Sequence, residues 1–300
     1  MRAPIGTGQF YAADAQLLTE EIAACYEGQR GPGALPLSRK DDDVRAIIAP
    51  NSPYRNCGQC MAWAYRRLAH TPRADVYIIS APNRVGSETC VTLDAYSTPL
   101  QAARVDQDLV RALVQQGSVT IEPEAHARET AIEVQLPFLQ HALGPEAEHL
   151  KVLPILVGET ADIPKLALDL KEAIVECKRE PIFIVSSSLT RYGPVFHFVP
   201  FASEVPERIA ELDEALLARI RAFDADGLRA TVDEQMSAMD GSRCVELLLR
   251  VLRPCAVEVE QVYTSGDILR DWKNSVTYAA IAFTERSSTE SQADKLVEFE

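Results

Sequence analysis

The sequence has no long apolar run and little positive charge, and each shortage excludes a class of protein. The longest apolar runs, such as residues 153–157, are far too short to cross a bilayer. The chain carries 30 Lys and Arg against 44 Asp and Glu, a formal net charge of −14. This balance argues against a nucleic acid or an anionic membrane as the main partner. The first twenty residues lack a basic start followed by an apolar core, so no signal peptide is expected.

Cysteine is too sparse for a disulfide-stabilised protein. Seven cysteines, an odd number, are scattered over 300 residues, a length that buries an ample core without them. We therefore expect a cytoplasmic protein with most thiols buried. Cys57 and Cys60 have the spacing of a redox pair or half a zinc site, but no second Cys or His pair follows at zinc spacing and a thioredoxin-like context is missing. These two thiols are expected to pack one helical turn apart.

Apolar runs of strand length alternate with segments of helical period. The strand candidates are residues 44–49, 76–80, 151–157, 182–186 and 276–283, with 257–263 weaker. Helical patterns begin at Asp14, after Cys57-Gly58, at residue 109, at Asp162 and at residue 209, and residues 243–252 are apolar nearly all round. The alternation predicts an α/β fold. Because the strands are apolar throughout, we expect a largely parallel or mixed central sheet covered by helices on both faces.

The domain organisation is simple. No stretch has the composition of an interdomain linker, which favours one domain over residues 1–284. Residues 28–43, rich in Gly, Pro and charge, are expected to form a surface loop, and the polar residues 285–300 a C-terminal tail.

Polar segments at residues 49–54, 80–85 and 186–193 are the candidate site. Two of them plainly follow a buried strand, and ligands of α/β proteins bind where strands end. The side chains of interest in these segments are Asn51, Tyr54, Asn83, Arg84, Ser188 and Arg191.

Five motifs occur in the same order as in one known family. They are residues 8–14, residues 46–50 with Tyr54 and Cys57-Gly58, residues 132–140, residues 265–267, and residues 275–283. Together they resemble the Memo-like family, also called AmmeMemoRadiSam system protein B, over roughly residues 6–284. The resemblance implies a fold similar to the class III extradiol dioxygenases, which are non-haem iron enzymes.

The resemblance also implies a metal site whose ligands this chain has lost. Family members carry two histidines and a cysteine as candidate ligands, and here those positions hold Asn51, Asn83 and Asp240. The family's Ser-Ser-Asp-x-x-His segment has Ser188 and Arg191 in place of its aspartate and histidine.

A Glu-His-Ser-x-Glu segment of the family has also changed. It corresponds to residues 129–133, where only Glu129 and Glu133 are kept and Thr130 replaces the histidine. Of the acidic residues nearby, Glu133 is the one that we expect near the pocket. His126 is expected at the surface.

Amides and a carboxylate are poor substitutes for imidazole and thiolate. Fe, Cu and Zn prefer nitrogen and sulfur donors, so we predict no bound transition metal and no cofactor. Arg84 and Arg191 stay charged in a protein. They could pair inward with Asp240, or point outward and clamp a carboxylate or phosphate. A Mg²⁺ or Ca²⁺ site on Asn51, Asn83 and Asp240 is a third reading, which adjacent arginines disfavour.

The sequence favours a non-catalytic binding or scaffold protein with a degenerate metal site. Its expected ligand is an anionic small molecule or an acidic or phosphorylated peptide; peptide recognition of this kind is implied by the resemblance. The alternatives are a metal-dependent redox or dioxygenase-type enzyme, a metal-free enzyme with Asp240 as base, or a vestigial pocket. The predicted ligand-binding residues are Asn51, Tyr54, Asn83, Arg84, Glu133, Ser188, Arg191 and Asp240.

Overall fold

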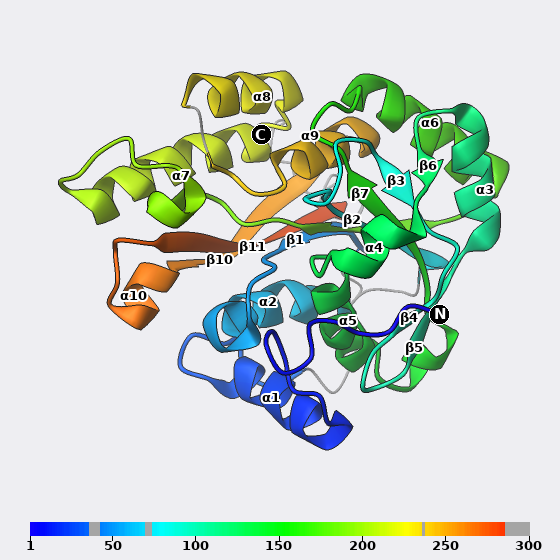
Figure 1. Cartoon of the computed structure of the whole chain (residues 1–300), viewed down its shortest axis with the longest axis horizontal. Coiled ribbons are helices and arrows are strands. Elements are labelled where there is room, and N and C mark those ends of the chain that lie inside the picture. Colours follow the sequence, from blue (N-terminus) through cyan, green and yellow to red (C-terminus); the bar gives the residue numbers. More distant parts are fainter. Residues whose placement is uncertain (36–42, 70–73, 236–237, 286–300) are drawn as a thin grey trace, which may run out of the picture.

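A mixed β-sheet runs through the centre of the computed structural model, with helices on both faces (Figure 1). The structure describes residues 1–35, 43–69, 74–235 and 238–285. Residues 286–300 of the expected tail, and residues 36–42 of the expected surface loop, lie outside the described residues.

The strands predicted from apolar runs are all present, and their ends agree within two residues. The central strands run parallel to one another, whereas β11 is antiparallel to both of its long neighbours, so the sheet is mixed. In spatial order the main path is β10 (Ala256–Thr264), β11 (Ser275–Glu285), β1 (Asp43–Ala49), β8 (Pro181–Ser186), β2 (Val76–Pro82), β7 (Lys151–Val157), β3 (Cys90–Val91) and β6 (Thr120–Ile121).

Short strands at the margins were not predicted, because two to four residues show no measurable period. β5 (Ala102–Val105) pairs with β7 and with β4 (Tyr96–Ser97), and β9 (Arg191–Tyr192) pairs with β11. The pairing of β9 with β11 fixes the backbone of Arg191, one of the candidate site residues.

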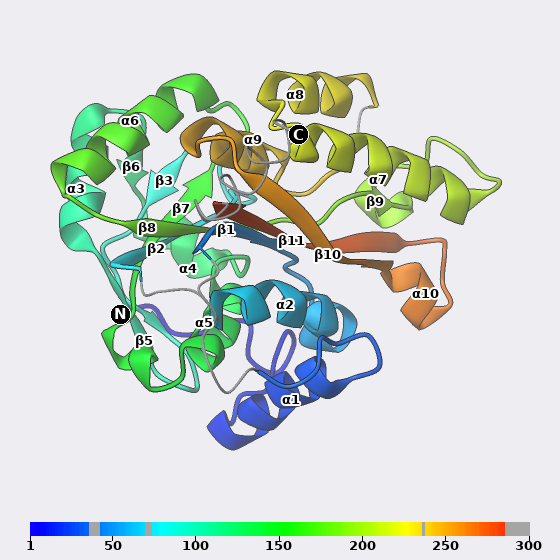
Figure 2. The same ribbon diagram turned by 180° about the vertical axis from the view of Figure 1, so that it is seen from behind.

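Helices cover the two faces in separate layers, seen from opposite sides in Figures 1 and 2. One face carries α1 (Ala15–Glu27), α2 (Tyr54–Ala69), α4 (Pro123–Arg128) and α5 (Leu136–Leu143), which follows the 3₁₀ turn η1 (Glu133–Gln135). The other carries α3 (Gln107–Gln116), α6 (Ile163–Glu176), α7 (Val205–Arg221), α8 (Ala225–Glu234) and α9 (Ser242–Val251). The remaining short elements are η2 (Gly144–His149), η3 (Pro194–Phe196) and α10 (Ser265–Leu269).

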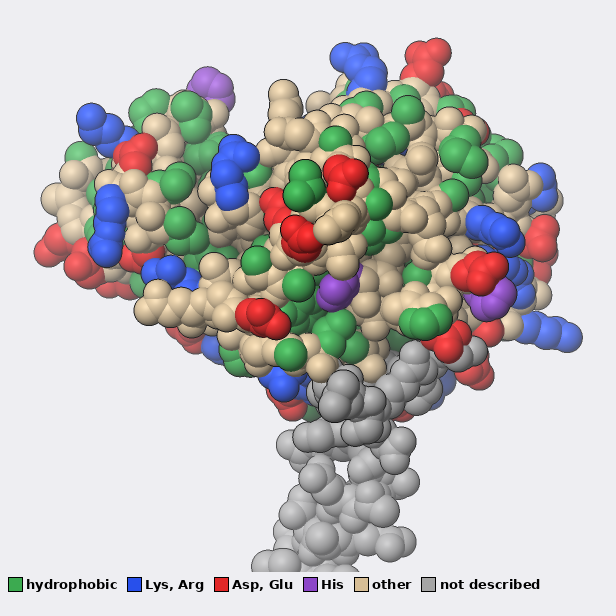
Figure 3. Space-filling model, turned by 90° about the horizontal axis from the view of Figure 1, so that it is seen from below, with side chains coloured by type: hydrophobic (Ala, Val, Ile, Leu, Met, Phe, Trp, Pro, Cys, Tyr) green, Lys and Arg blue, Asp and Glu red, His purple; other side chains and the backbone are tan. Residues whose placement is uncertain are grey.

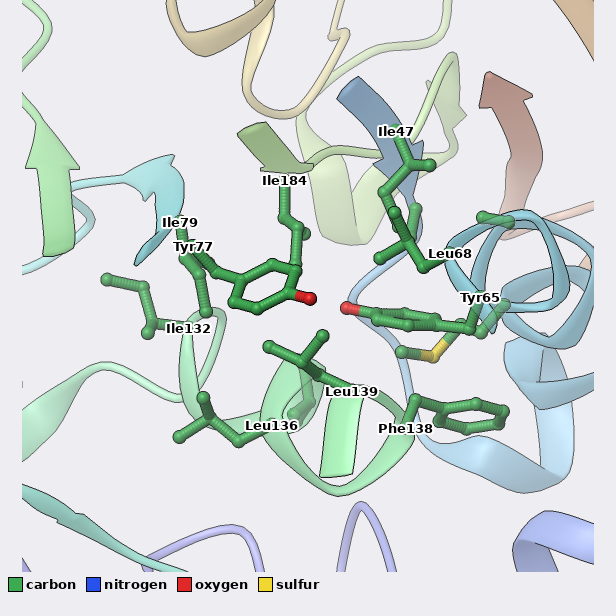
Figure 4. Close-up of a cluster of buried hydrophobic side chains, with 14 of the residues drawn as sticks. Ile47, Tyr65, Leu68, Tyr77, Ile79, Ile132, Leu136, Phe138, Leu139 and Ile184 are labelled. Carbon is green, nitrogen blue, oxygen red and sulfur yellow. The ribbon is translucent and has the colours of Figure 1, made fainter. Parts of the chain in front are cut away.

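Successive residues of the central strands point alternately toward the two helical layers. Ile47 and Ile184 belong to the core under α2 and α5, whereas Ile48 and Val185 belong to the core under α6 and α9. This follows from the two-residue period of a strand. Figure 4 shows Ile47 and Ile184 pointing from the sheet toward Leu139 and its neighbours on α5.

Local signals for helix starts are mostly confirmed. Asp14 caps α1 by accepting from the backbone N–H groups of Gln16 and Leu17, and Asp162 caps α6. The expected start of α2 after Cys57-Gly58 is wrong, because the helix already begins at Tyr54. Gly58 allows close packing inside the helix, since a Cβ there would lie 2.4 Å from the sulfur of Cys25 and would force that side chain to move.

The cysteine prediction is confirmed for the pair with Cys-x-x-Cys spacing. Cys57 and Cys60 are free and fully buried on α2, and burial raises the pKa of both thiols. A protonated thiol is a poor nucleophile and a poor metal ligand, so these two residues serve packing. None of the helices within the described ranges has the length and apolar character that a bilayer span requires.

Candidate functional site

The three polar segments meet at one edge of the sheet. β1, β8 and β2 are parallel neighbours, so their carboxyl ends lie together. Asn51 follows β1, Arg84 follows β2, and Arg191 follows β8 on the short strand β9. Asp240, just before α9, joins them through an isolated antiparallel bridge to Ser188. The fold thus brings together residues from four separate parts of the chain.

Asp240 is the centre of the cluster and accepts from both arginines. Its Oδ1 accepts from Nε of Arg84 at 3.2 Å, and its Oδ2 from Nη2 of Arg84 at 2.5 Å. Oδ2 also accepts from Nη2 of Arg191 at 2.7 Å. The contact with Arg84 is bidentate, the geometry in which a guanidinium binds a carboxylate best. Of the sequence alternatives, the structure therefore shows the inward pairing of both arginines.

Asn51 links the carboxylate to the second arginine. Its Nδ2 donates to Oδ2 of Asp240 at 2.8 Å, while its Oδ1 accepts from Nη2 of Arg191 at 3.3 Å. Ser188 Oγ lies 3.5 Å from the same amide oxygen. An amide has both a donor and an acceptor, so one side chain serves an anion and a cation at once. Asn51 and Ser188 are both buried.

Glu129 is a member of the cluster that the sequence analysis missed. Its Oε1 accepts from Nη1 of Arg84 at 2.8 Å and from the backbone N–H of Ala131 at 2.9 Å, and the residue is buried. Arg84 thus lies between two carboxylates. The signal for Glu129 lies in the family segment at residues 129–133, of which this chain keeps the two glutamates.

The charges of the cluster balance. Two guanidinium groups face the carboxylates of Asp240 and Glu129. Burial lowers the pKa of Arg84, but the two carboxylates outweigh it and the net shift is upward. For Arg191, burial lowers the pKa and the nearby Arg84 adds to this, and the opposing effects of Asp240, Tyr278 and Glu129 do not offset them. Both arginines remain cations at neutral pH.

Backbone contacts fix the position of Asp240. Its carbonyl oxygen accepts from Oγ of Ser187 at 2.5 Å and from the N–H of Ser188 at 3.2 Å. The next residue, Gly241, has a φ of +79° and starts α9. A Cβ at Gly241 would lie 2.9 Å from the carbonyl oxygen of Ser186, so the turn requires glycine.

A pocket of about 250 Å³ opens beside the cluster. Three arginines line it, namely Arg84, Arg191 and Arg243, together with Asp240 and the exposed Glu159. Arg243 is itself bound to Glu246 at 2.8 Å. The volume is just below the usual range for drug-sized ligands, about 300–1,000 Å³, so it admits a small polar group rather than a large ring.

Asn83 lines the pocket, but its amide is used by its own loop. Nδ2 donates to the carbonyl oxygen of Glu88 at 2.8 Å, and Oδ1 accepts from the N–H groups of Val85 and Gly86 at 3.1 and 2.9 Å. This is an Asx turn, which shapes the segment that presents Arg84. Asn83 therefore acts on the site through the backbone.

Tyr54 is placed in the core rather than at the pocket. Its side chain is buried, its ring packs edge-on against Phe138 at a centroid distance of 4.8 Å, and its hydroxyl donates to the carbonyl oxygen of Val134 at 2.6 Å. The reason is that α2 starts at Tyr54, one turn earlier than expected, and turns this residue toward α5. The expectation that Tyr54 binds ligand at the pocket is therefore wrong.

Glu133 is also not a neighbour of Asp240. It is completely buried and accepts from Nη1 of Arg2 at 2.6 Å, from the hydroxyl of Tyr11 at 2.6 Å and from the N–H of Gly6 at 2.7 Å. It anchors the N-terminal segment to η1. The expectation that Glu133 is the glutamate near the pocket is wrong, and Glu129, four residues earlier, takes that place.

His126 was expected at the surface and is buried instead. Its Nδ1 lies 2.8 Å from the hydroxyl of Tyr96 and its Nε2 lies 3.3 Å from the carbonyl oxygen of Cys90. Burial lowers its pKa to about 4, so the ring is neutral at physiological pH. Arg2, which donates to the carbonyl oxygens of His126 and Glu129, holds this region against the N-terminal segment.

A metal ion implied by the resemblance does not fit these residues. Among the residues that the structure describes, no group of three or more His, Cys, Asp and Glu could hold one. Two guanidinium groups already surround Asp240 and would repel a third cation. A Mg²⁺ or Ca²⁺ site fits no better, because the amide of Asn83 is bound within its loop.

Comparison with known proteins shows which family the chain resembles over its length. A family model described as Memo-like protein matches residues 2–282. A MEMO1 family protein of Methanosarcina acetivorans is 31% identical over 294 residues, covering 94% of this chain and 98% of the relative. One from Methanopyrus kandleri is 30% identical over 294 residues, with the same coverage. A solved structure of an uncharacterized protein from Escherichia coli K12 aligns with 80% of this chain and 99% of its own, at 12% identity and a TM-score of 0.49. The match extends over nearly the whole sequence, and the chain belongs to the Memo-like family.

Proposed function

We propose that this chain is a non-catalytic binding or scaffold protein that recognises an anionic group at the pocket beside Asp240. One observation carries the proposal: Arg84 and Arg191 both pair with Asp240 at the place that the resemblance gives to a metal. Two arginine side chains, which are permanent cations, take the place of a metal ion, which can dissociate. The geometry supports recognition of negative charge and gives no support to metal-dependent redox or dioxygenase-type chemistry.

The ligand class follows from the lining of the pocket. Three arginines offer planar donors that suit a carboxylate or a phosphate. Arg84 keeps 35% of its side chain exposed and Arg191 keeps 21%, so both are reachable from solvent. At about 250 Å³ the pocket suits a small anion, or a single acidic or phosphorylated side chain of a peptide.

The same geometry counts against Asp240 as a general base. Its Oδ2 accepts from both guanidinium groups and from Asn51, and its Oδ1 accepts from Arg84. A substrate proton would have to displace one of these donors before transfer. The carboxylate is better suited to orienting the arginines.

Two measurements test the proposal on the purified full chain. Elemental analysis is expected to find Fe, Cu and Zn only in substoichiometric amounts, and stoichiometric metal held by these side chains would overturn it. Calorimetric titration with inorganic phosphate and with a small dicarboxylate is expected to show binding that weakens at least tenfold, about 1.4 kcal/mol, in Arg191→Met. Arg229→Met is the matched control, since Arg229 pairs with Asp233 on the exposed face of α8. Equal binding by both variants, or none by the wild type, contradicts the proposal.

A cytoplasmic location is part of this proposal. It rests on the free cysteines of the described chain, most of which are buried. Cell fractionation with the untagged protein tests it, and recovery in an oxidising compartment would contradict it.

A further inference from the structure

A second hollow lies at the opposite edge of the sheet, away from Asp240. It has a volume of about 670 Å³ and is lined by the first residues of β1 and β8, the last turns of α6 and α9, and the end of β11. We call it the basal groove. Because the strands that form the site have their carboxyl ends at the other edge, the groove is independent of the proposed anion pocket.

The floor of the basal groove is apolar. Ile174 and Val175 from α6, Phe183 from β8, and Val251 and Leu252 from the end of α9 line it. Val175 is 74% exposed, which is high for a branched aliphatic side chain on a packed helix. An apolar floor of this kind gains free energy when another apolar segment covers it.

The rim of the groove is basic. Arg45, Lys171, Arg179 and Arg253 line it. Arg45 and Arg179 are engaged with carboxylates, but Lys171 and Arg253 are exposed and make no ion pair with another described residue. In a chain with a formal net charge of −14, this local excess of positive charge is unusual. A complementary occupant combines apolar and acidic side chains.

The chain supplies such a segment directly at the groove. Glu285, the last residue of β11, is itself part of the lining, and its Oε2 accepts from Nη2 of Arg45 at 2.7 Å. Residues 286–300 follow it and close with Leu296-Val297-Glu298-Phe299-Glu300. In an extended segment, Val297 and Phe299 point to one side and Glu298 and Glu300 to the other.

We propose that residues 296–300 bind in the basal groove of the same chain. Val297 and Phe299 cover the apolar floor, while Glu298 and Glu300 meet Lys171 and Arg253 at the rim. The ten residues 286–295 separate Glu285 from Leu296. They span at most about 36 Å when extended, so the tether permits the segment to fold back into the groove. Tethering also raises the effective concentration of the segment to about the millimolar range.

Hydrogen exchange on the full chain tests the docking. In the double variant Val297→Ser/Phe299→Ser, amides of residues 171–183 and 251–256 are expected to exchange about tenfold faster, equal to about 1.4 kcal/mol of lost docking free energy. Residues 54–69 of α2, on the other face of the sheet, serve as the internal reference. Gln292→Ser/Ala293→Ser is the control: it also carries two substitutions, but in the tether, and is expected to leave the hydrogen exchange unchanged. Unchanged exchange in the Val297/Phe299 variant overturns the proposal.

Swapping the charges between the rim and residues 298 and 300 tests whether this segment is what occupies the groove. Lys171→Glu/Arg253→Glu is expected to release the segment and speed exchange at the groove. Adding Glu298→Lys/Glu300→Lys is expected to restore the slow exchange, because the two charges are swapped across the contact. Failure of this rescue overturns the assignment. The measurement is repeated at a tenfold lower protein concentration, since docking within one chain is independent of concentration. Protection that disappears on dilution assigns the groove to a second copy instead.

Discussion

Arg191 donates to Asp240 from a position 49 residues earlier in the chain, with 2.7 Å between Nη2 and Oδ2. The same carboxylate oxygen accepts from Arg84. One negative charge thus allows two guanidinium groups to lie close together in a half-buried site. Without that charge they repel each other and lose their best hydrogen-bond acceptor.

Asp240→Asn is expected to lower the free energy of unfolding by about 3 kcal/mol. This is the low end of the range for a broken buried ion pair, because Arg84 is 35% exposed and solvent relieves part of the loss. Urea denaturation followed by circular dichroism measures it. Asp233→Asn, which breaks the exposed pair with Arg229, is the control and should cost less than about 1 kcal/mol. The idea fails if the two variants lose the same stability.

Gly241→Ala is expected to destabilise the protein more than Gly117→Ala. Both glycines have a left-handed backbone, with φ of +79° and +88°. Each substitution carries a conformational cost of about 1–2 kcal/mol, because an L-residue is disfavoured in the left-handed region. Only at Gly241 does the added Cβ also meet a backbone oxygen, that of Ser186 at 2.9 Å, whereas Gly117 has nothing within 4 Å. Thermal unfolding compares them, and equal losses would show that the turn tolerates a side chain.

Arg2→Met is expected to cost about 3–5 kcal/mol, because it leaves the fully buried carboxylate of Glu133 without its cation. Asp94→Asn, which breaks the exposed pair between Asp94 and the chain's amino terminus, is the control and should cost less than about 1 kcal/mol. Adding Glu133→Gln to Arg2→Met should recover part of the loss, since the charge is then gone. No recovery in denaturant unfolding would assign the cost to packing of the arginine stem.

Stability is expected to fall as the pH drops from about 6.5 toward about 4. Burial lowers the pKa of His126 from 6.5 to about 4, so over this range the unfolded chain binds a proton that the folded chain does not. The free energy of unfolding then decreases by up to about 1.4 kcal/mol per pH unit from this residue. His141 shifts in the same direction, also through burial.

The contribution of His126 is isolated by comparison. His126→Gln should show a shallower decrease between pH 6.5 and 4.5 than the wild type in urea denaturation. His149→Gln, at an exposed position on η2, should keep the full slope. Parallel curves for all three proteins would mean that His126 titrates in the folded protein as it does in the unfolded chain.

The sequence was informative about the fold wherever periodicity is strong. Runs such as residues 151–157 predicted β7 with its exact ends, because continuous burial leaves a continuous apolar pattern. The short strand β9 could not be found in this way, since its two residues are defined by pairing with β11 rather than by their own pattern. The expected start of α2 was too late because its apolar pattern was read only from Met61 onward, whereas Gly58 lies inside the helix in close contact with Cys25.

At the site, the sequence is informative about residues that follow strands. Asn51, Arg84 and Arg191 lie together because parallel strands bring their carboxyl ends together, and Asp240, just before α9, joins them. Prediction failed for Glu129 and Glu133, which lie four residues apart around a turn. Which of the two contacts Arg84 depends on how the Thr130–Ile132 backbone bends before η1, and no local pattern encodes that.

The cluster around Asp240 also bears on how long the folded protein survives. Asn51 and Asp240 are 189 positions apart, and Arg84 and Asp240 are 156 apart. We expect these contacts to form late in folding, because their side chains come together only once β1, β2 and β8 have paired. Interactions absent from the transition state slow unfolding without accelerating folding. These ion pairs should therefore lengthen the lifetime of the native state and leave the speed of its formation unchanged.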